Sequence, residues 1–549
     1  MEPPKLEGNL KRRANRQQSV SASRKSSFVE RSTGPCLDGS LETSKSSPSR
    51  ILRPVHLLTH SRKDATKKLL VMKFGGTSVR DASCIERVAA IIHAAARENF
   101  VAVVVSAMSG VTNTLVEAAS QAQAGNAESV SGILEELRLR HESVANALIK
   151  SPARRKKVLC GIRETVREGK RLCDEVLSGR AISLRNLDAI SGLGECLSAP
   201  LVAAALCELG IVSEAIVATE IVVTDNCHGA AEPDMNLTAA RCEARLRPLI
   251  RQGVVPVVTG FIGATIDGVP TTLGRNSSDY SGTIVGAALR ADEVTLWTDV
   301  DGILTADPKL VPGAATIPEM TYREASDLAG LGAKVLHPKT LRPVMRQGIP
   351  LVIRNTFAID SPGTRITPGL PPLVGNVRAL VATRDLAMVT VCGIDEAGVL
   401  NFWGRVNDIS KSTGIKIHLV CQSESKDDIG FVISCASAAL VLDSMRRQFA
   451  SDLSHECVNS VTLEPNVAVI TVFGQRICGD PEFLARTFDS LGRSHVRILG
   501  VGRDYSETAF SFVIGQGDIQ SASVAIHHGL HSELDSNSTV RSKSSAQSF

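Results

Sequence analysis

An internal repeat in the C-terminal third restricts the possible folds of this chain more than any other feature. The segment 386–393 (LAMVTVCG) aligns with 467–474 (VAVITVFG) at an offset of 81 residues (467 − 386). The same offset aligns 415–433 with 496–514, and both segments end in Phe-Val-Ile. Each copy reads strand, helix, strand, strand, helix over roughly 70 to 80 residues. We therefore predict two α+β domains of the same kind, at 380–458 and 459–530.

The first half of the chain has the pattern of a parallel α/β sheet. The apolar run 69–74 ends in Gly75-Gly76, which is typical of a buried strand entering a turn. An amphipathic stretch at about 84–96 and the apolar run 101–105 follow with short connections. We predict a three-layer αβα sandwich with a largely parallel central sheet at 68–368. We also predict strands at 254–258, 293–297 and 350–353 and a helical insertion at about 116–185. The α/β pattern ends near 362–363.

The two ends of the chain have few residues that could build a core. Residues 1–67 are rich in Ser, Arg and Lys and predict a disordered basic extension, and 531–549 predict a disordered tail. A plastid transit peptide is the alternative for the extension, because such peptides are rich in Arg and Ser, although Glu2, Glu7 and Glu30 argue against it. We therefore expect a cytoplasmic protein, with the plastid as the alternative.

Composition argues against several classes of protein. Aromatic residues make up only 3% and much of the net charge of +4 comes from the N-terminal extension, so we expect no nucleic-acid partner. We find no apolar run of about eighteen residues, so we expect no membrane partner. The 13 cysteines form no Cys-x-x-Cys pair and no Cys/His group with zinc spacing. This indicates a reducing compartment and no metal held by the protein alone.

The segment Lys73-Phe-Gly-Gly-Thr-Ser78 lies where the first strand ends and a helix begins. Gly75 and Gly76 would let backbone N–H groups approach a phosphate, at a helix N-terminus that favours negative charge. Lys73 can neutralise charge on a transferring phosphoryl group. A plain Gly-Gly turn beside a surface lysine is the alternative, because the segment lacks the Walker pattern.

A second polar cluster, Gly274-Arg-Asn-Ser-Ser-Asp279, precedes an apolar stretch that starts at about 282. Arg275 could hold a substrate carboxylate with two N–H groups, and Ser278 could donate to the same ligand. Asp279 could orient donors or help to position a metal. The structural alternative, which is compatible with the first, is that a serine caps a helix whose dipole Asp279 complements.

Two more segments follow in the second half of the predicted sheet region. Thr298 and Asp299 come directly after an apolar strand, where open α/β sheets bind ligands. An Asx turn closed by Gly302 is the alternative there. The segment 332–338 (GAKVLHP) adds Lys334, and we interpret its His337 as structural.

Together these segments resemble the aspartate kinases of the amino-acid kinase superfamily. The resemblance runs from about 71 to 367 and continues through the repeat. It rests on six segments in the order of the family: KFGGTS at 73–78, SAMSGVTN at 106–113, SGLGECLSA at 191–199, TLGRNSSDYS at 272–281, WTDVDGILTADP at 297–308 and GAKVLHP at 332–338. The repeat is similar to the paired ACT domains, of βαββαβ topology, through which this family senses amino acids.

The resemblance implies a role for each matching residue. Lys73 would lie on the transferring phosphate, and Asp279 would keep this charged centre in order. The contacts to aspartate would be Thr112, Glu195 (to the ammonium group), Arg275 (to a carboxylate) and Ser278. The contacts to ATP would be Lys73, Gly75, Gly76, Thr298, Asp299, Lys309 and Lys334. The family often has a second glycine where this chain has Ser277, and an arginine or tyrosine near the nucleotide where this chain has Lys309 and Leu304.

The resemblance also implies a reaction and its regulation. The γ-phosphoryl group of ATP, with Mg²⁺, would pass to the β-carboxylate of L-aspartate, the first step toward lysine (and diaminopimelate), threonine, methionine and isoleucine. Lysine or threonine would inhibit through the ACT domains of a homodimer or homotetramer, and the segment 420–425 slightly favours threonine.

Three alternatives are compatible with parts of this pattern. One is another kinase of the superfamily, acting on glutamate, acetylglutamate or uridylate, against which Glu195 and the repeat argue. A second is a non-catalytic amino-acid sensor, against which Lys73, Arg275 and Asp279 argue. The third is a fused aspartate kinase–homoserine dehydrogenase, against which we count the missing dinucleotide fingerprint.

Overall fold

A computed structural model describes most of the chain between residues 67 and 530. The described ranges are 67–274, 277–332, 336–369, 377–392, 396–422, 428–450, 458–475, 477–503 and 507–530. Residues 1–66 of the predicted extension, the predicted tail, Arg275 and Lys334 lie outside the described residues.

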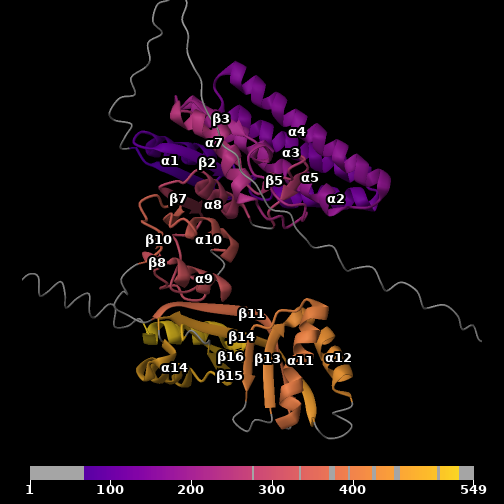
Figure 1. Ribbon diagram of the computed structural model, residues 1–549, viewed down its shortest axis with the longest axis vertical. Coiled ribbons are helices and arrows are strands. Elements are labelled where there is room, and N and C mark those ends of the chain that lie inside the picture. Colours follow the sequence, from indigo (N-terminus) through magenta and orange to yellow (C-terminus); the bar gives the residue numbers. More distant parts are fainter. Residues whose placement is uncertain are drawn as a thin grey trace, which may run out of the picture. The chain divides into compact units, whose positions relative to one another are not determined.

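An eight-stranded sheet forms the first half of the described chain, with the order β3-β4-β2-β1-β7-β9-β10-β8 (Figure 1). The first six strands in this order are parallel, which confirms the predicted sheet. The bounds are β1 (Leu69–Phe74), β2 (Phe100–Val105), β3 (Ser213–Ile216), β4 (Val255–Thr259), β7 (Glu293–Thr298), β8 (Glu319–Thr321), β9 (Leu351–Asn355) and β10 (Thr364–Thr367). The sheet closes slightly later than predicted, because β10 follows Gly363 and pairs antiparallel to β9. A separate hairpin joins β5 (Ile262–Ala264) to β6 (Pro270–Thr272).

Helices cover both faces of this sheet, as the side-chain alternation of its strands requires. Met72 and Phe74 of β1 face a core shared with α1 (Ala82–Ala96) and α6 (Leu193–Glu208). Val71 faces the opposite core, which it shares with four other helices of this half: α7 (Met235–Arg251), α8 (Ser278–Ala288), α9 (Tyr322–Gly330) and α10 (Pro338–Met345). The predicted three-layer sandwich is therefore confirmed.

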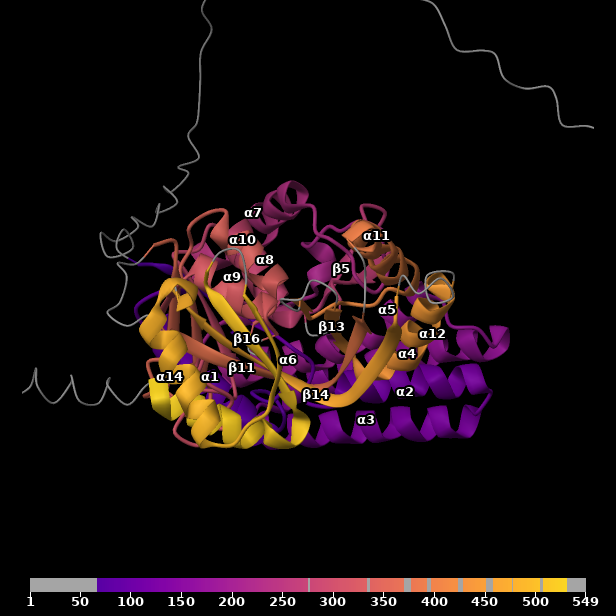
Figure 2. The same cartoon turned by 90° about the horizontal axis from the view of Figure 1, so that it is seen from below.

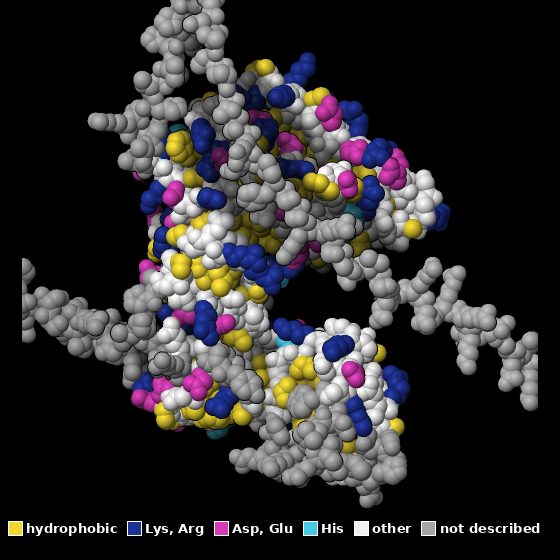
Figure 3. Space-filling model, viewed as in Figure 1, with side chains coloured by type: hydrophobic (Ala, Val, Ile, Leu, Met, Phe, Trp, Pro, Cys, Tyr) yellow, Lys and Arg dark blue, Asp and Glu magenta, His cyan; other side chains and the backbone are white. Residues whose placement is uncertain are grey.

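The predicted helical insertion is a set of long helices that lie side by side in both ribbon views (Figures 1 and 2). They are α2 (Val111–Ala124), α3 (Ala127–Leu148) and α4 (Pro152–Gly179), followed by α5 (Leu184–Ser191). Charges of both signs are mixed on their surface (Figure 3), and several form ion pairs, such as Arg138 with Glu135 and Glu142. Such a surface is typical of solvated helices.

One stretch of the described chain, 184–208, is long and apolar enough to cross a membrane by length and composition alone. This differs from the expectation that the chain has no such run. However, 78% of its most apolar window is buried inside the protein, where α6 fills the core against β4 and α1. Its apolar character is thus explained by packing within the sandwich.

The repeat forms a six-stranded antiparallel sheet with the order β12-β13-β11-β14-β16-β15. The predicted element order is confirmed in both copies. The first copy comprises β11 (Val377–Cys392), α11 (Glu396–Thr413), β12 (Leu419–Gln422), β13 (Asp428–Ser434) and α12 (Ala438–Gln448). The second comprises β14 (Ser460–Gly474), α14 (Pro481–Arg493), β15 (Ile498–Arg503), β16 (Ala509–Gly515) and a helix at 519–530.

The two central strands of this sheet are bent at equivalent positions. Asp385 and Asn466, which are 81 residues apart, have left-handed backbone angles (φ 59° and 58°), and the register of β11 with β14 shifts beside them. Asp and Asn tolerate this conformation better than other non-glycine residues. Beyond the bend, 377–383 of β11 pair with 469–474 of β14, whereas 388–392 pair with 460–464. Each copy therefore completes its sheet with a half-strand from the other copy. The predicted domain boundary between residues 458 and 459 stays a prediction.

The second copy, together with the half-strand 377–383 that completes its sheet, also contacts the first half of the chain within the unit Arg62–Phe549. Leu380 N–H donates to the Thr305 carbonyl (2.7 Å), and Thr305 Oγ1 lies 2.9 Å from His527 Nε2. Ala306, Leu310 and Val311 are buried in the same core as Leu380 and the second copy. The carboxylate of Glu324 on α9 binds Arg378 (3.1 Å) and Gln475 (3.0 Å). Loop 303–311 is thus built into the core of the second copy.

Two helix glycines allow a stability test with opposite expected signs. A Cβ on Gly286 of α8 would overlap Val294, whereas a Cβ on Gly161 of α4 would meet no atom within 4 Å. We expect Gly286→Ala to lower the free energy of unfolding by about 1–3 kcal/mol through overpacking. Gly161→Ala should raise it by up to about 1 kcal/mol, because Ala favours helix. Chemical denaturation of both variants checks this, and equal signs would contradict the packing of α8 on β7.

Candidate active site

A buried ion pair lies at the centre of the first sheet. Lys73, on the central strand β1, is only 4% exposed, and its Nζ lies 2.6 Å from Asp279 Oδ1. The Asp279 side chain, in the first turn of α8, is 31% exposed. A buried lysine needs such a partner to remain charged, and the partial exposure of Asp279 leaves one side of the pair accessible.

Glycines bring α8 and the turn after β1 close to this lysine. A Cβ on Gly282 would lie 2.8 Å from Lys73 Cβ, and one on Gly75 would lie 3.6 Å from Lys73 Nζ. Gly75 N–H donates to the Trp297 carbonyl (3.1 Å), and the Gly76 carbonyl accepts from Ser109 N–H (3.1 Å). Residues 73–76 are therefore held between the ends of β7 and β2, at the carboxyl edge of the parallel strands.

Glu195 provides a second carboxylate close to Lys73, and this one is buried. It lies in the first turn of α6 and is 2% exposed. Its Oε1 accepts from Ala107 N–H (3.1 Å), while Oε2 has no partner among the described residues. Burial raises the pKa of Glu195 to about 8, although the Ala107 N–H and the charge of Lys73 act in the opposite direction. An unpaired buried carboxyl oxygen is suited to a cationic ligand.

The structure describes the remaining predicted acceptor contacts to different degrees. Ser278 begins α8 beside Gly260, since a Cβ added to this glycine would lie 3.2 Å from Ser278 Cβ. Ser277 Oγ is buried and has no partner among the described residues, so the residue that replaces the glycine of the family brings an unpaired hydroxyl. Thr112 is the second residue of α2 and is half-buried. Arg275 lies outside the described residues.

The predicted nucleotide contacts are more scattered. Thr298 ends β7, next to β1, and its Oγ1 lies 3.3 Å from Asp299 Oδ1. Lys309 is exposed in loop 303–311, and its backbone N–H binds Asp307 Oδ1 (2.9 Å). Lys334 lies outside the described residues, so the structure does not place it against the Lys73–Asp279 pair. The described residues contain no group of three His, Cys, Asp or Glu side chains that could hold a metal ion.

Sequence analysis missed two residues that support the site. Arg140 of α3 donates to the carbonyls of Arg80 (3.2 Å) and Ser109 (3.0 Å), and thus links the helical insertion to two loops of the site. Asp188 of α5 is 3% exposed and binds three groups far from it in sequence. The only sequence signal for Asp188 was its place beside the apolar residues Leu187, Ala189 and Ile190.

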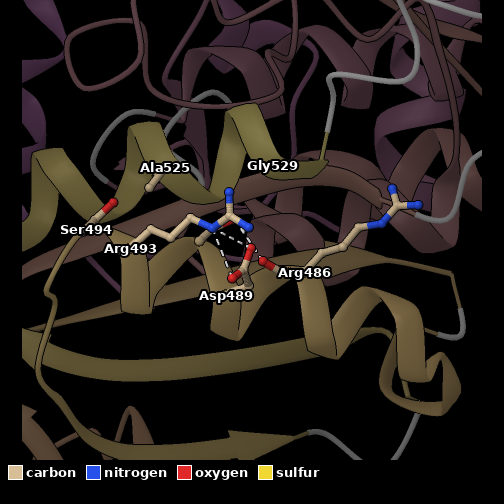
Figure 4. A pocket seen from close by; sticks show the side chains of 7 residues that line it. Arg486, Asp489, Arg493, Ser494, Ala525 and Gly529 are labelled. Carbon is tan, nitrogen blue, oxygen red and sulfur yellow. Dashed lines mark hydrogen bonds and ion pairs between the residues drawn. The ribbon is translucent and has the colours of Figure 1, made fainter.

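A cavity of about 280 Å³ lies elsewhere, between α14 and helix 519–530 (Figure 4). Its charged side chains are Arg486, Asp489 and Arg493. Arg493 pairs with Asp489 (2.9 Å) and Arg486 with Glu482, and both arginines are solvent-exposed or half-exposed. These are ordinary pairs along one helix, so the cavity offers no unpaired charge to a ligand.

The comparison with known proteins agrees with the geometry of the Lys73 site. The model of the amino acid kinase family matches residues 68–355. The chain belongs to the amino acid kinase family. Within this family its resemblance to the aspartate kinases is confirmed. Aspartokinase 1, chloroplastic, of Arabidopsis thaliana is 29% identical over 83% of this chain and 79% of that protein.

Longer relatives match the same part of this amino acid kinase. Bifunctional aspartokinase/homoserine dehydrogenase 1, chloroplastic, of Zea mays is 31% identical over 83% of this chain but only 50% of that protein. The chain thus spans about half the length of the bifunctional relatives that it matches.

Solved structures support the fold over both halves. E. coli aspartokinase III in complex with lysine and aspartate is 27% identical, with a TM-score of 0.67 over 84% of this chain and 99% of that chain. The same E. coli protein in complex with aspartate and ADP gives a TM-score of 0.67 at 26% identity. The likeness covers the kinase fold and the repeat, which confirms the predicted fold class.

The raised pKa of Glu195 predicts a pH dependence of stability. Between its ordinary value of 4.5 and about 8, the folded chain holds a proton that the unfolded chain releases. The contribution of Glu195 to stability therefore falls as pH rises through this range. We expect Glu195→Gln, without ligand, to be more stable than the unaltered chain at pH 8, with a smaller difference at pH 5. Chemical denaturation at both pH values checks this, with Glu86→Gln on the exposed side of α1 as the control. An equal difference in stability between Glu195→Gln and the unaltered chain at both pH values would refute the prediction.

Proposed function

We propose that this chain is an aspartate kinase that transfers the γ-phosphoryl group of ATP to the β-carboxylate of L-aspartate, giving ADP and 4-phospho-L-aspartate. The observation that carries the proposal is the buried Lys73–Asp279 pair with the unpaired carboxyl oxygen of Glu195 nearby. One cation suits the transferring phosphoryl group, and one buried anion suits the ammonium group of an amino acid.

The reaction requires charge neutralisation more than proton transfer. The side-chain carboxylate of free aspartate has a pKa near 3.9, so it is ionised at neutral pH and needs no general base. The difficulty is to bring this anion into line with the γ-phosphate of ATP. Lys73 supplies positive charge between the two anions, and Asp279 orients its Nζ. Burial of Lys73 strengthens this attraction and keeps water from the reactive acyl phosphate.

Glu195 selects an acceptor that carries an ammonium group. Without ligand, burial holds its carboxyl protonated at neutral pH, because its pKa is raised to about 8. An ammonium group at the unpaired Oε2 would favour the ionised form, so binding of aspartate would release a proton. Thr112, Arg275 and Ser278 are proposed to hold the two carboxylates of the substrate, in the roles that the family resemblance gives them.

The nucleotide is proposed to bind over Gly75 and Gly76, toward Thr298, Asp299, Lys309 and Lys334. The E. coli relative binds ADP together with aspartate. Mg²⁺ commonly keeps several waters and is held by substrate phosphates with one or two carboxylates, rather than by a cage of protein ligands. The accessible Asp279 and Asp299 fit such a partial ligand set. The ion would screen the phosphate charges of ATP.

A hydroxamate assay tests the reaction directly, because hydroxylamine traps an acyl phosphate. With ATP, Mg²⁺ and L-aspartate we expect activity, and none with L-glutamate in place of aspartate. Lys73→Ala should lower kcat by about 10²–10³, the usual effect of removing one group that stabilises the transition state. Lys68→Ala, an exposed lysine just before β1, is the matched control and should keep full activity.

The outcome also separates the alternatives. Activity with glutamate alone would assign the chain to another kinase of the superfamily. A folded protein without activity toward any acceptor would favour a non-catalytic sensor, and calorimetry with single amino acids would then identify its ligand.

Regulation is proposed to act through the repeat, in a homodimer or homotetramer that lysine or threonine inhibits. The E. coli relative binds lysine as well as aspartate. Deleting the repeat would be a poor test, because Ala306, Leu310 and Val311 would lose the core that they share with the second copy. Single substitutions at the contacts between the two halves preserve that core.

The Arg378–Glu324 pair is the contact best suited to such a substitution, because both side chains are less than 10% exposed. Burial alone would raise the pKa of Glu324, but hydrogen bonds from Thr321 and Gln475 and the charge of Arg378 lower it. We expect Arg378→Met to weaken inhibition by the effective amino acid about tenfold, with a smaller change in uninhibited kcat. Arg384→Met, an exposed arginine of the same strand, is the control. Identical inhibition curves for the two variants would show that the Arg378–Glu324 pair does not transmit inhibition.

The compartment is proposed from the relatives alone. The Arabidopsis and Zea relatives are chloroplastic, which supports the plastid alternative for residues 1–67 over the cytoplasm. Fluorescent fusions with and without these residues would distinguish the two locations.

A further inference from the structure

Asp188 is a buried carboxylate that joins three segments around the proposed acceptor site. It lies on α5, seven residues before Glu195 (195 − 188), and is 3% exposed. Its oxygens accept from His228 Nδ1 (2.8 Å), from Gly229 N–H (3.0 and 3.1 Å) and from the Thr272 hydroxyl. The helix that leads to Glu195, the loop 225–232 and the end of β6 therefore meet at one carboxylate.

The loop 225–232 is held by hydrogen bonds within itself and to its neighbours. Asp225 Oδ1 accepts from the N–H groups of Cys227 and Glu232 (both 3.1 Å). The loop also bonds to the end of β6, because Ala231 N–H donates to the Thr272 carbonyl (2.9 Å). At its far end Glu232 accepts from the Tyr280 hydroxyl of α8 (3.1 Å).

These contacts reach the start of α8, which carries Ser278 and Asp279. Thr272 lies just before Gly274, and Tyr280 lies just after Ser278 and Asp279. The start of α8, which carries Ser278 and Asp279, is thus attached through Tyr280 to the same loop as Thr272, and Asp188 holds this loop and Thr272 together. A shift of about 1 Å in such a segment can cost two orders of magnitude in rate.

We propose that Asp188 is a positioning residue of the acceptor site, which acts through Thr272 and loop 225–232 to place Ser278 and Asp279, at the start of α8, relative to Glu195. It does not touch the reacting atoms. The inference rests on the proposed function for its kinetic consequence, but the positioning itself can be measured without any activity.

The hydroxyl of Thr272 allows a controlled test. Thr272→Val removes the bond to Asp188 and keeps the shape of the side chain, whereas Thr272→Ser keeps the hydroxyl. Thr271→Val is the matched control, because Thr271 is equally buried on the same strand but binds Thr224 (2.7 Å) instead of Asp188. We expect Thr272→Val to raise KM for aspartate about tenfold, with KM for ATP changed less than about twofold. Thr272→Ser and Thr271→Val should stay near the values of the unaltered chain.

Amide hydrogen exchange on the full chain provides the second measurement. Thr272→Val should speed exchange in 225–232 and 272–281, and Thr271→Val should not, because only the first loosens the junction at Asp188. Asp188→Asn should reproduce the Thr272→Val pattern if it folds. Equal exchange and equal KM for aspartate in the two valine variants would overturn the positioning role. If the unaltered chain phosphorylates no aspartate, the proposed function fails, and the exchange comparison alone decides whether Asp188 orders this segment.

Discussion

The buried pair of Lys73 and Asp279 is the constraint on which the rest of the catalytic half depends. A lysine inside a parallel sheet is costly unless a carboxylate reaches it. Asp279 reaches it because Gly282 lets α8 lie almost in contact with β1, and Gly286 lets the same helix lie against β7. The glycines of α8 therefore allow the N-terminus of this helix, with the carboxylate of Asp279, to reach the buried amino group of Lys73.

The site combines this satisfied pair with groups that are left unsatisfied. Glu195 Oε2 and Ser277 Oγ are buried without partners among the described residues. Unpaired buried polar groups destabilise a folded chain, each by about 1–3 kcal/mol. A ligand with an ammonium group and acceptor oxygens would relieve this cost on binding. In the proposed function, the free energy that the fold loses at these atoms would favour a zwitterionic acceptor.

Sequence analysis could predict those features that local pattern determines. The apolar run before Gly75, the 81-residue repeat and the polar ends of strands were enough for the sheet, the two copies and the groups Lys73 and Asp279, whereas Glu195 came from the family resemblance. It could not find Asp188, because its partners lie 40 and 84 residues away and only folding brings them together. Nor could it find the exchange of half-strands between the copies, since a bend at Asp385 leaves the alternation of side chains on each side unchanged.

The exchange of half-strands connects the repeat directly to loop 303–311, which carries the proposed nucleotide contact Lys309. Residues 377–383 connect the kinase half to the sheet of the second copy, and Leu380 within them bonds to Thr305. Loop 303–311, which carries Lys309, packs into the same core. Any ligand that changes the bend at Asp385 would alter the packing on which this loop rests. A coupling of about 1–3 kcal/mol, typical of allosteric enzymes, requires no more than a difference of a few such contacts between two states.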